Sequence, residues 1–131
     1  MATKNKSNRY PGLTLRILGE LRPAMGPGRA ALLEKIVVTG SISAAARELG
    51  MSYRRAWQLV EAMNEAFIQE LVAASTGGKR GGGAVVTPLG RKVLERFRAM
   101  ERKATASITP DLKAMNLMLA SSTPRKQGGR H

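Results

Sequence analysis

Two stretches of apolar residues at helical spacing, joined at a glycine, dominate the middle of the chain. The first stretch contains Ile42, Ala45, Ala46 and Leu49. The second starts at Ser52, whose hydroxyl is the expected N-cap, and contains Ala56, Val60, Met63 and Phe67. Because residues three and four positions apart share one face of a helix, both stretches predict amphipathic helices. Gly50, which lies between them, predicts a tight reversal with positive φ.

Beyond the second helix the pattern changes to short apolar runs around a glycine-rich segment. Residues 71–75 and 84–87 are apolar or small, and the segment 76–83 contains five glycines together with Lys79 and Arg80. Two such runs around a glycine-rich loop predict a β-hairpin. Gly78-Lys79 does not make a P-loop, since Ala73 and Arg80 stand where that motif needs glycine and Ser or Thr.

The flanking segments predict further elements. A helix is expected over residues 27–38, with Gly40 as its stop and with Ala31, Leu32, the stem of Lys35, Ile36 and Val38 on its apolar face. Ser43 is the expected N-cap of the helix that follows. Residues 13–18 alternate and favour a strand, although a helix remains open there. Thr87-Pro88 is a helix start signal, and Thr109-Pro110 repeats it.

The predicted fold class is mostly α with a small β-hairpin wing (α+β): a winged helix-turn-helix with a C-terminal dimerisation helix. The winged domain covers 10–106 and includes the dimerisation helix 88–106. A short C-terminal helix follows over 107–120. Residues 1–9 and 121–131 are expected to be a disordered basic arm and a disordered basic tail.

Charge points to the partner. The chain has 22 Lys and Arg against 9 Asp and Glu, a formal net charge of +13. Such an excess favours a polyanion, with nucleic acid first and an anionic membrane surface second. Cysteine is absent and His131 is the single histidine. We therefore expect no catalytic residues, no metal and no cofactor, and a cytoplasmic protein that neither crosses nor binds a membrane.

The second helix of the pair is the candidate recognition helix for double-stranded DNA. Its outward positions are Tyr53, Arg54, Trp57, Gln58 and Glu61, and Arg55 is a further candidate DNA contact. Arg54 or Arg55 suits guanine and Gln58 suits adenine, whereas an arginine that binds only phosphate is the plainer alternative. Trp57 either packs on DNA or on the wing, or is partly buried in the core.

Two further surfaces are expected to bind a partner. Lys79 and Arg80 at the hairpin tip are expected to touch phosphates or a minor groove, the alternative being a solvated loop. The helix from Pro88 carries an apolar stripe that predicts a dimer interface, with a membrane-surface helix as a weaker alternative. That stripe consists of Leu89, Val93, Leu94, Phe97 and Met100.

Several motifs together resemble the N-terminal domain of ModE-type molybdenum-responsive regulators and, more distantly, LysR-type DNA-binding domains. They are residues 41–46, Gly50-Met51-Ser52-Tyr53, Ala56-Trp57, Met63-Asn64 and above all the wing 76–87. The resemblance spans about Leu13 to Ala106. It implies a homodimeric bacterial regulator that binds a palindromic operator near molybdate-transport or molybdoenzyme genes. Its DNA contacts would be Ser52, Tyr53, Arg54, Trp57, Lys79 and Arg80.

Longer members of that family carry C-terminal domains that bind molybdate. Nothing after Ala106 resembles such a domain, so we do not carry molybdate sensing over to these residues. A separate molybdate-binding protein is one expected partner. Two rival interpretations remain open: a nucleoid-type protein that binds DNA without sequence preference, and an adaptor whose 112–119 segment binds a protein.

Overall fold

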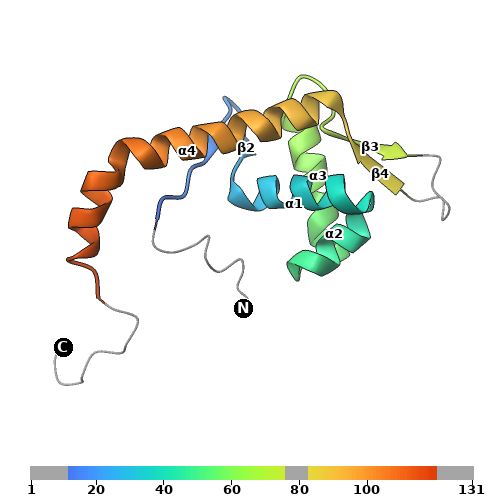
Figure 1. Ribbon diagram of the computed structural model, residues 1–131. Coiled ribbons are helices and arrows are strands. Elements are labelled where there is room, and N and C mark those ends of the chain that lie inside the picture. Colours follow the sequence, from blue (N-terminus) through green and yellow to red (C-terminus); the bar gives the residue numbers. More distant parts are fainter. Residues whose placement is uncertain (1–11, 76–82, 121–131) are drawn as a thin grey trace. The chain divides into compact units, whose positions relative to one another are not determined.

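The computed structural model describes residues 12–75 and 83–120 (Figure 1). In chain order the elements are β1 (Ile17–Leu18), β2 (Pro23–Met25), α1 (Pro27–Thr39), α2 (Ile42–Leu49), α3 (Tyr53–Ala66), β3 (Val72–Ser75), β4 (Gly83–Val86) and α4 (Pro88–Asn116). The chain divides into two compact units, and residues 14–101 form the larger one. This unit contains the predicted helix pair and hairpin, and the mostly helical, winged fold class is confirmed.

Helix α1 has the predicted ends but a different buried face. Proline stands in its first turn, and Gly40 closes it at φ 68° with its N–H donating to the Ile36 carbonyl. The residues that it buries are Ala30, Leu32, Leu33 and Ile36. Val38, predicted to face the core, is 77% exposed. A helix turns by 100° per residue, and the buried stripe is centred between Leu32 and Leu33, which leaves Val38 on the far side.

The turn between α2 and α3 forms as the glycine predicted. Gly50 has φ 71° and its N–H donates to carbonyls at the end of α2. The N-cap of α2 is Ser41 and not Ser43, because the Ala44 N–H donates to Ser41 Oγ at 3.0 Å. An N-cap hydroxyl accepts from an amide two or three residues on, so a helix that begins at Ile42 needs its cap at position 41.

The core of the larger unit is one apolar cluster shared by its helices and strands. No buried polar or charged residue occurs among the described residues. The cluster comprises Met25, Ala30, Leu32, Leu33, Ile36, Ala45, Ala46, Ala56, Val60, Met63, Leu71, Val72, Ala84, Val86 and Phe97. Since α3 contributes Ala56, Val60 and Met63, its opposite face is fixed outward.

Strands β3 and β4 pair antiparallel from Val72↔Val86 to Ser75↔Gly83. Two contacts hold this hairpin against the helices. The Ala84 N–H donates to the Gly40 carbonyl at 3.0 Å. The Asn64 side chain accepts from the Leu71 and Val72 N–H groups at 2.8 and 3.1 Å and donates to the Val72 carbonyl at 3.0 Å. Asn64 therefore sets where the wing leaves α3.

Replacing Asn64 by alanine should destabilise the domain by about 1–3 kcal/mol, because two amides and one carbonyl lose a part-buried partner. Asn64→Asp is the matched control. It keeps the acceptor for both amides but sets a carboxylate against the Val72 carbonyl, so an intermediate loss is expected. Urea unfolding followed by circular dichroism measures both. A midpoint for Asn64→Ala equal to that of the natural chain would contradict this function of Asn64.

Helix α4 begins as predicted but does not break where predicted. The Gly90 N–H donates to Thr87 Oγ1 at 3.0 Å, so Thr87 is a side-chain cap. The sequence predicted a second helix after Thr109-Pro110, whereas α4 continues through Pro110 to Asn116. Proline removes one helical hydrogen bond and need not end a helix whose other residues favour it. Thr109 Oγ1 donates to the Thr105 carbonyl in this stretch.

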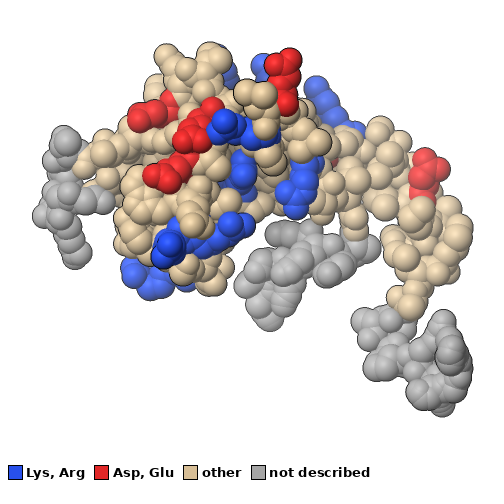
Figure 2. Space-filling model, turned by 180° about the vertical axis from the view of Figure 1, so that it is seen from behind, with Lys and Arg blue, Asp and Glu red and all other residues tan. Residues whose placement is uncertain are grey.

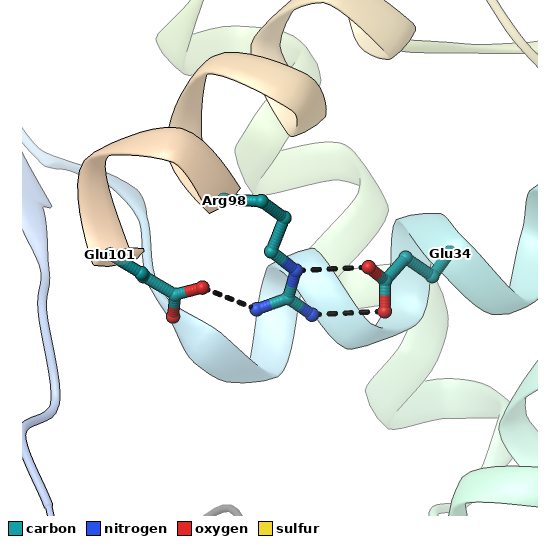
Figure 3. Close-up of polar contacts among 3 residues, drawn as sticks. All are labelled: Glu34, Arg98 and Glu101. Atoms are coloured by element: carbon teal, nitrogen blue, oxygen red, sulfur yellow. Dashed lines mark hydrogen bonds and ion pairs between the residues drawn. The ribbon is translucent and has the colours of Figure 1, made fainter. Parts of the chain in front are cut away.

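The first part of α4 is tied to α1 by an ion-pair cluster (Figure 3). Arg98 donates from Nε and Nη2 to the two Glu34 oxygens, both at 2.9 Å, and from Nη1 to Glu101 Oε1 at 2.7 Å. These hydrogen bonds raise the pKa of Arg98, against an opposing effect of burial. A bidentate pair constrains orientation as well as distance, so the Arg98 guanidinium is held in one orientation against Glu34 of α1.

The N-terminal pattern is only partly realised. The predicted strand at 13–18 is two residues long, and it pairs with β2 in the register Ile17↔Met25 and Leu18↔Pro23. No local pattern in the sequence predicts β2, which begins at a proline. Proline is tolerated at the first position of a strand, where no ladder hydrogen bond from it is needed.

Candidate nucleic-acid interface

Helix α3 presents a polar face that is set by its cap and its core contacts. Ser52 is extended and accepts a hydrogen bond from the Arg55 N–H at 3.0 Å, as the sequence predicted. Burial of the opposite face leaves Tyr53, Arg54 and Gln58 exposed in the first two turns. Base contacts of a recognition helix come from these first turns. The local geometry therefore suits insertion of α3 into a major groove.

The two aromatic residues of α3 lie on its wing side. Tyr53 and Trp57 are 51% and 40% exposed, and both line a hollow of about 610 Å³ with β3 and the start of β4. Trp57 therefore lies at the surface between α3 and the wing, and not in the core. An aromatic wall beside a recognition helix can pack on deoxyribose or on a thymine methyl group.

Charge is unevenly distributed along α3. Arg54 and Arg55 stand in the first turn, whereas Glu61 and Glu65 stand in the later turns. Glu65 is paired with Arg22 at 2.6 Å. In Figure 2 one group of Lys and Arg side chains lies at the lower edge, and other Lys and Arg side chains lie among the acidic ones above it. A phosphate backbone is thus favoured near the start of α3 and opposed near its end.

Neighbouring arginines on α3 serve two different surfaces. Arg54 is on the outward face with Gln58, while Arg55 lines a separate hollow with residues of α1 and the segment before it. The sequence left both as candidates for guanine, because it does not show that α1 and the segment before it lie beside Arg55. Arg16 and Arg29, which line the same hollow, were missed as site residues because they lie far from the helix pair in sequence.

The other predicted site residues are placed as follows. Lys79 and Arg80 lie outside the described residues. Phe97, predicted for a dimer interface, is 2% exposed and belongs to this chain's own core, against which Leu89, Val93 and Leu94 also pack. Met100, at 37%, is the most open of the five. Most of the stripe therefore covers this chain's own core, and pairing of two copies through this helix stays a prediction.

Two absences are found among the described residues. Within 12–75 and 83–120, no three His, Cys, Asp or Glu side chains are grouped so that they could hold a metal ion. No helix in these ranges is both long and apolar enough to cross a bilayer.

The helix pair, its turn at Gly50 and the adjoining hairpin define a winged helix-turn-helix domain. Residues 29–91 match the family model for bacterial regulatory helix-turn-helix proteins of the LysR family. The α-helical pair and β4 both fall inside this range. The chain thus carries a LysR-type helix-turn-helix, which confirms the more distant resemblance noted in the sequence.

Comparison with curated relatives shows which kind of helix-turn-helix domain this chain resembles. The chain is 48% identical over 93 residues to the molybdenum-pterin-binding protein MopB of Rhodobacter capsulatus, a match that covers 71% of this chain and 34% of that protein. It is 40% identical over 85 residues to the DNA-binding transcriptional dual regulator ModE of Escherichia coli K12, covering 65% and 32%. It is 36% identical over 112 residues to the transcriptional regulator ModE of Yersinia pestis, covering 83% and 42%. The helix-turn-helix domain is accordingly of the ModE type.

The chain spans between about a third and two fifths of the length of these relatives. Similarity therefore concerns the helix-turn-helix part, and what the longer proteins bind elsewhere does not transfer with it.

Proposed function

We propose that this chain is a sequence-specific DNA-binding transcriptional regulator of molybdenum-related genes. The observation that carries the proposal is the first half of α3, where Arg54 and Gln58 are exposed on a helix whose other face is locked in the core. Guanidinium and carboxamide groups are the side chains that read guanine and adenine edges in the major groove. Relatives that are named as ModE regulators support the same function.

In the proposed complex α3 enters the major groove and the wing lies along the flanking backbone. Lys79 and Arg80 are expected to hold phosphates from that wing, which would add affinity for any sequence. The net charge of +13 adds long-range attraction. The protein would act in the cytoplasm, where bacterial DNA lies, and no catalytic step is part of the proposal.

We also propose that the regulator acts as a homodimer on a two-fold symmetric operator. The half-buried Leu89, Val93 and Leu94 and the more exposed Met100 are the described positions on which a second copy can pack, while Phe97 supports them from inside. Two copies would place two recognition helices on half-sites about one helical turn or a multiple of it apart.

A second candidate function is a nucleoid-type protein without sequence preference. Its supporting observation is the charge, because phosphate contacts alone can supply strong binding to any duplex. A separate molybdate-binding protein is a further proposed partner, because one relative is named a molybdenum-pterin-binding protein.

Selection of genomic fragments by the purified protein, at near-physiological salt with and without molybdate, should recover a palindrome. Enrichment follows from base contacts by α3, because phosphate contacts do not distinguish sequences. Competition with random-sequence duplex serves as the control. Uniform recovery without a motif would reject the sequence-specific function in favour of the nucleoid-type one. Occupancy that changes with molybdate would indicate an effector acting on this chain.

A further inference from the structure

A hollow of about 240 Å³ lies on the side of α3 away from the wing. It is lined by Arg16, Pro23, Met25, Gly26, Gly28, Arg29, Arg55 and Leu59. Three of these residues are arginines, and they come from three separate places: the segment before β1, helix α1 and helix α3. No carboxylate lines the hollow. Tertiary folding therefore gathers three like charges around one small concave surface.

The arginines are held there by specific contacts. Arg29 donates from Nη1 to the Pro23 and Ala24 carbonyls at 2.9 and 3.4 Å, which fixes its guanidinium plane. A Cβ at Gly26 would lie 3.4 Å from Arg16 Nη1 and 3.6 Å from Arg16 Cγ, so Arg16 lies over this glycine. The first turn of α1 beneath it has no acidic residue and no side-chain cap.

The charges are left uncompensated within the described residues. None of the ion pairs found there includes Arg16, Arg29 or Arg55. The pKa of Arg29 is lowered, by burial first and then by the positive charges of Arg55 and Arg16. A protein gains nothing in stability from convergence of like charges, since they repel each other and lose hydration. A bound anion would remove that cost.

We infer that Arg16, Arg29 and Arg55 form a binding site for one phosphate-type oxyanion. Guanidinium groups donate in a fixed fork that matches the oxygens of a tetrahedral anion, and several forks around one hollow bind it from several sides. Two sources could supply this group: the DNA backbone and a free anion. For the first source, the inference rests on the proposed function. Arg55 follows Arg54 on the recognition helix, so the backbone of a DNA strand that borders the groove entered by α3 would pass beside Arg55.

This assignment divides the start of α3 into two functions. Arg54 faces the bases, whereas Arg55 anchors a phosphate together with two residues that precede the helix pair in sequence. A clamp of this kind sets how deeply and at what angle α3 enters the groove. It would bind every sequence equally.

The test compares the double variant Arg16→Gln/Arg55→Gln with Arg54→Gln/Arg91→Gln, which removes the same charge from α3 and α4 outside the hollow. Arg29 is left unchanged because its contacts with β2 are structural. Duplex binding is measured between about 50 and 200 mM salt, and unfolding temperatures verify that both variants fold. A second arm titrates inorganic phosphate, at constant ionic strength and without DNA, while following the amide signals of Gly26, Gly28 and Arg29 by NMR.

With a backbone phosphate in the hollow, the double variant should bind operator and random duplex about tenfold more weakly alike, and its salt slope should flatten by about one unit. The control pair should lose preference for the operator instead. With a free anion as occupant, phosphate should shift the amide signals of Gly26, Gly28 and Arg29 in the natural chain and not in the double variant. The inference is overturned if the double variant keeps both the salt slope and the phosphate response of the natural chain.

Failure of the proposed function would look different. If the natural chain selects no motif, sequence-specific regulation is rejected, yet the salt slope on random duplex and the phosphate titration still test the hollow. If it selects a motif but the double variant matches the natural chain in both arms, only the oxyanion site is rejected.

Discussion

Replacing Gly90 by alanine is expected to destabilise the domain by about 3 kcal/mol or more, a large part of the stability of a small domain. A Cβ at this buried position would collide with the Leu71 carbonyl oxygen and lie 2.7 Å from Val86 Cγ1. The carbonyl cannot retreat easily, because it accepts hydrogen bonds from the Thr87 N–H at 2.9 Å and from Thr87 Oγ1 at 3.3 Å. Helix α4 would have to move away from the wing.

Gly28→Ala is the matched control. Gly28 is also a helical glycine, but it is exposed and a Cβ there meets nothing within 4 Å. Alanine is the better helix former, so this variant should equal the natural chain or exceed its stability by up to about 1 kcal/mol. Thermal and urea unfolding of the three proteins measure the difference. Equal stability of the two variants would show that α4 does not need close approach at Gly90.

Arg54→Ala is expected to reduce the preference for operator over random duplex by about 1–3 kcal/mol, the contribution of one bidentate base contact. The unfolding midpoint should barely change, since Arg54 is exposed and has no ion-pair partner among the described residues. Affinity for random duplex should fall much less than affinity for the operator. Fluorescence anisotropy with both duplexes at one salt concentration measures the ratio.

Lys79→Ala gives the contrasting result. Loss of a wing lysine that contacts only phosphate should weaken binding to both duplexes alike. It should also reduce the slope of log affinity against log salt concentration by about one unit. Arg91→Ala, which removes one exposed charge from α4, shows the effect of net charge alone. If Arg54→Ala and Lys79→Ala change the two affinities in the same proportion, the division into base reader and phosphate clamp is wrong.

The helix pair was predictable because its signals are local. Apolar spacing, the Ser52 hydroxyl and Gly50 act within one or two turns of chain, and each appears in the structure as expected. Predictions failed where contacts with residues far away in the sequence determine the burial or the secondary structure. Val38 and Phe97 are both apolar on helices, yet one is exposed and the other is in the core. Pro23–Met25 is a strand because it pairs with β1, and no local pattern in the sequence predicted it.

The candidate interface was likewise predictable from the sequence in part only. The sequence determined the helix-turn-helix class, the ModE-type resemblance and the set of outward residues on α3, since helical periodicity alone separates one face from the other. The tertiary structure decided that Arg54 and Arg55 serve different surfaces, that Asn64 and Gly90 set the wing and α4, and that Arg16 joins Arg29 and Arg55 around one hollow. These outcomes depend on contacts between residues far apart in sequence, and such contacts exist only when the core has formed.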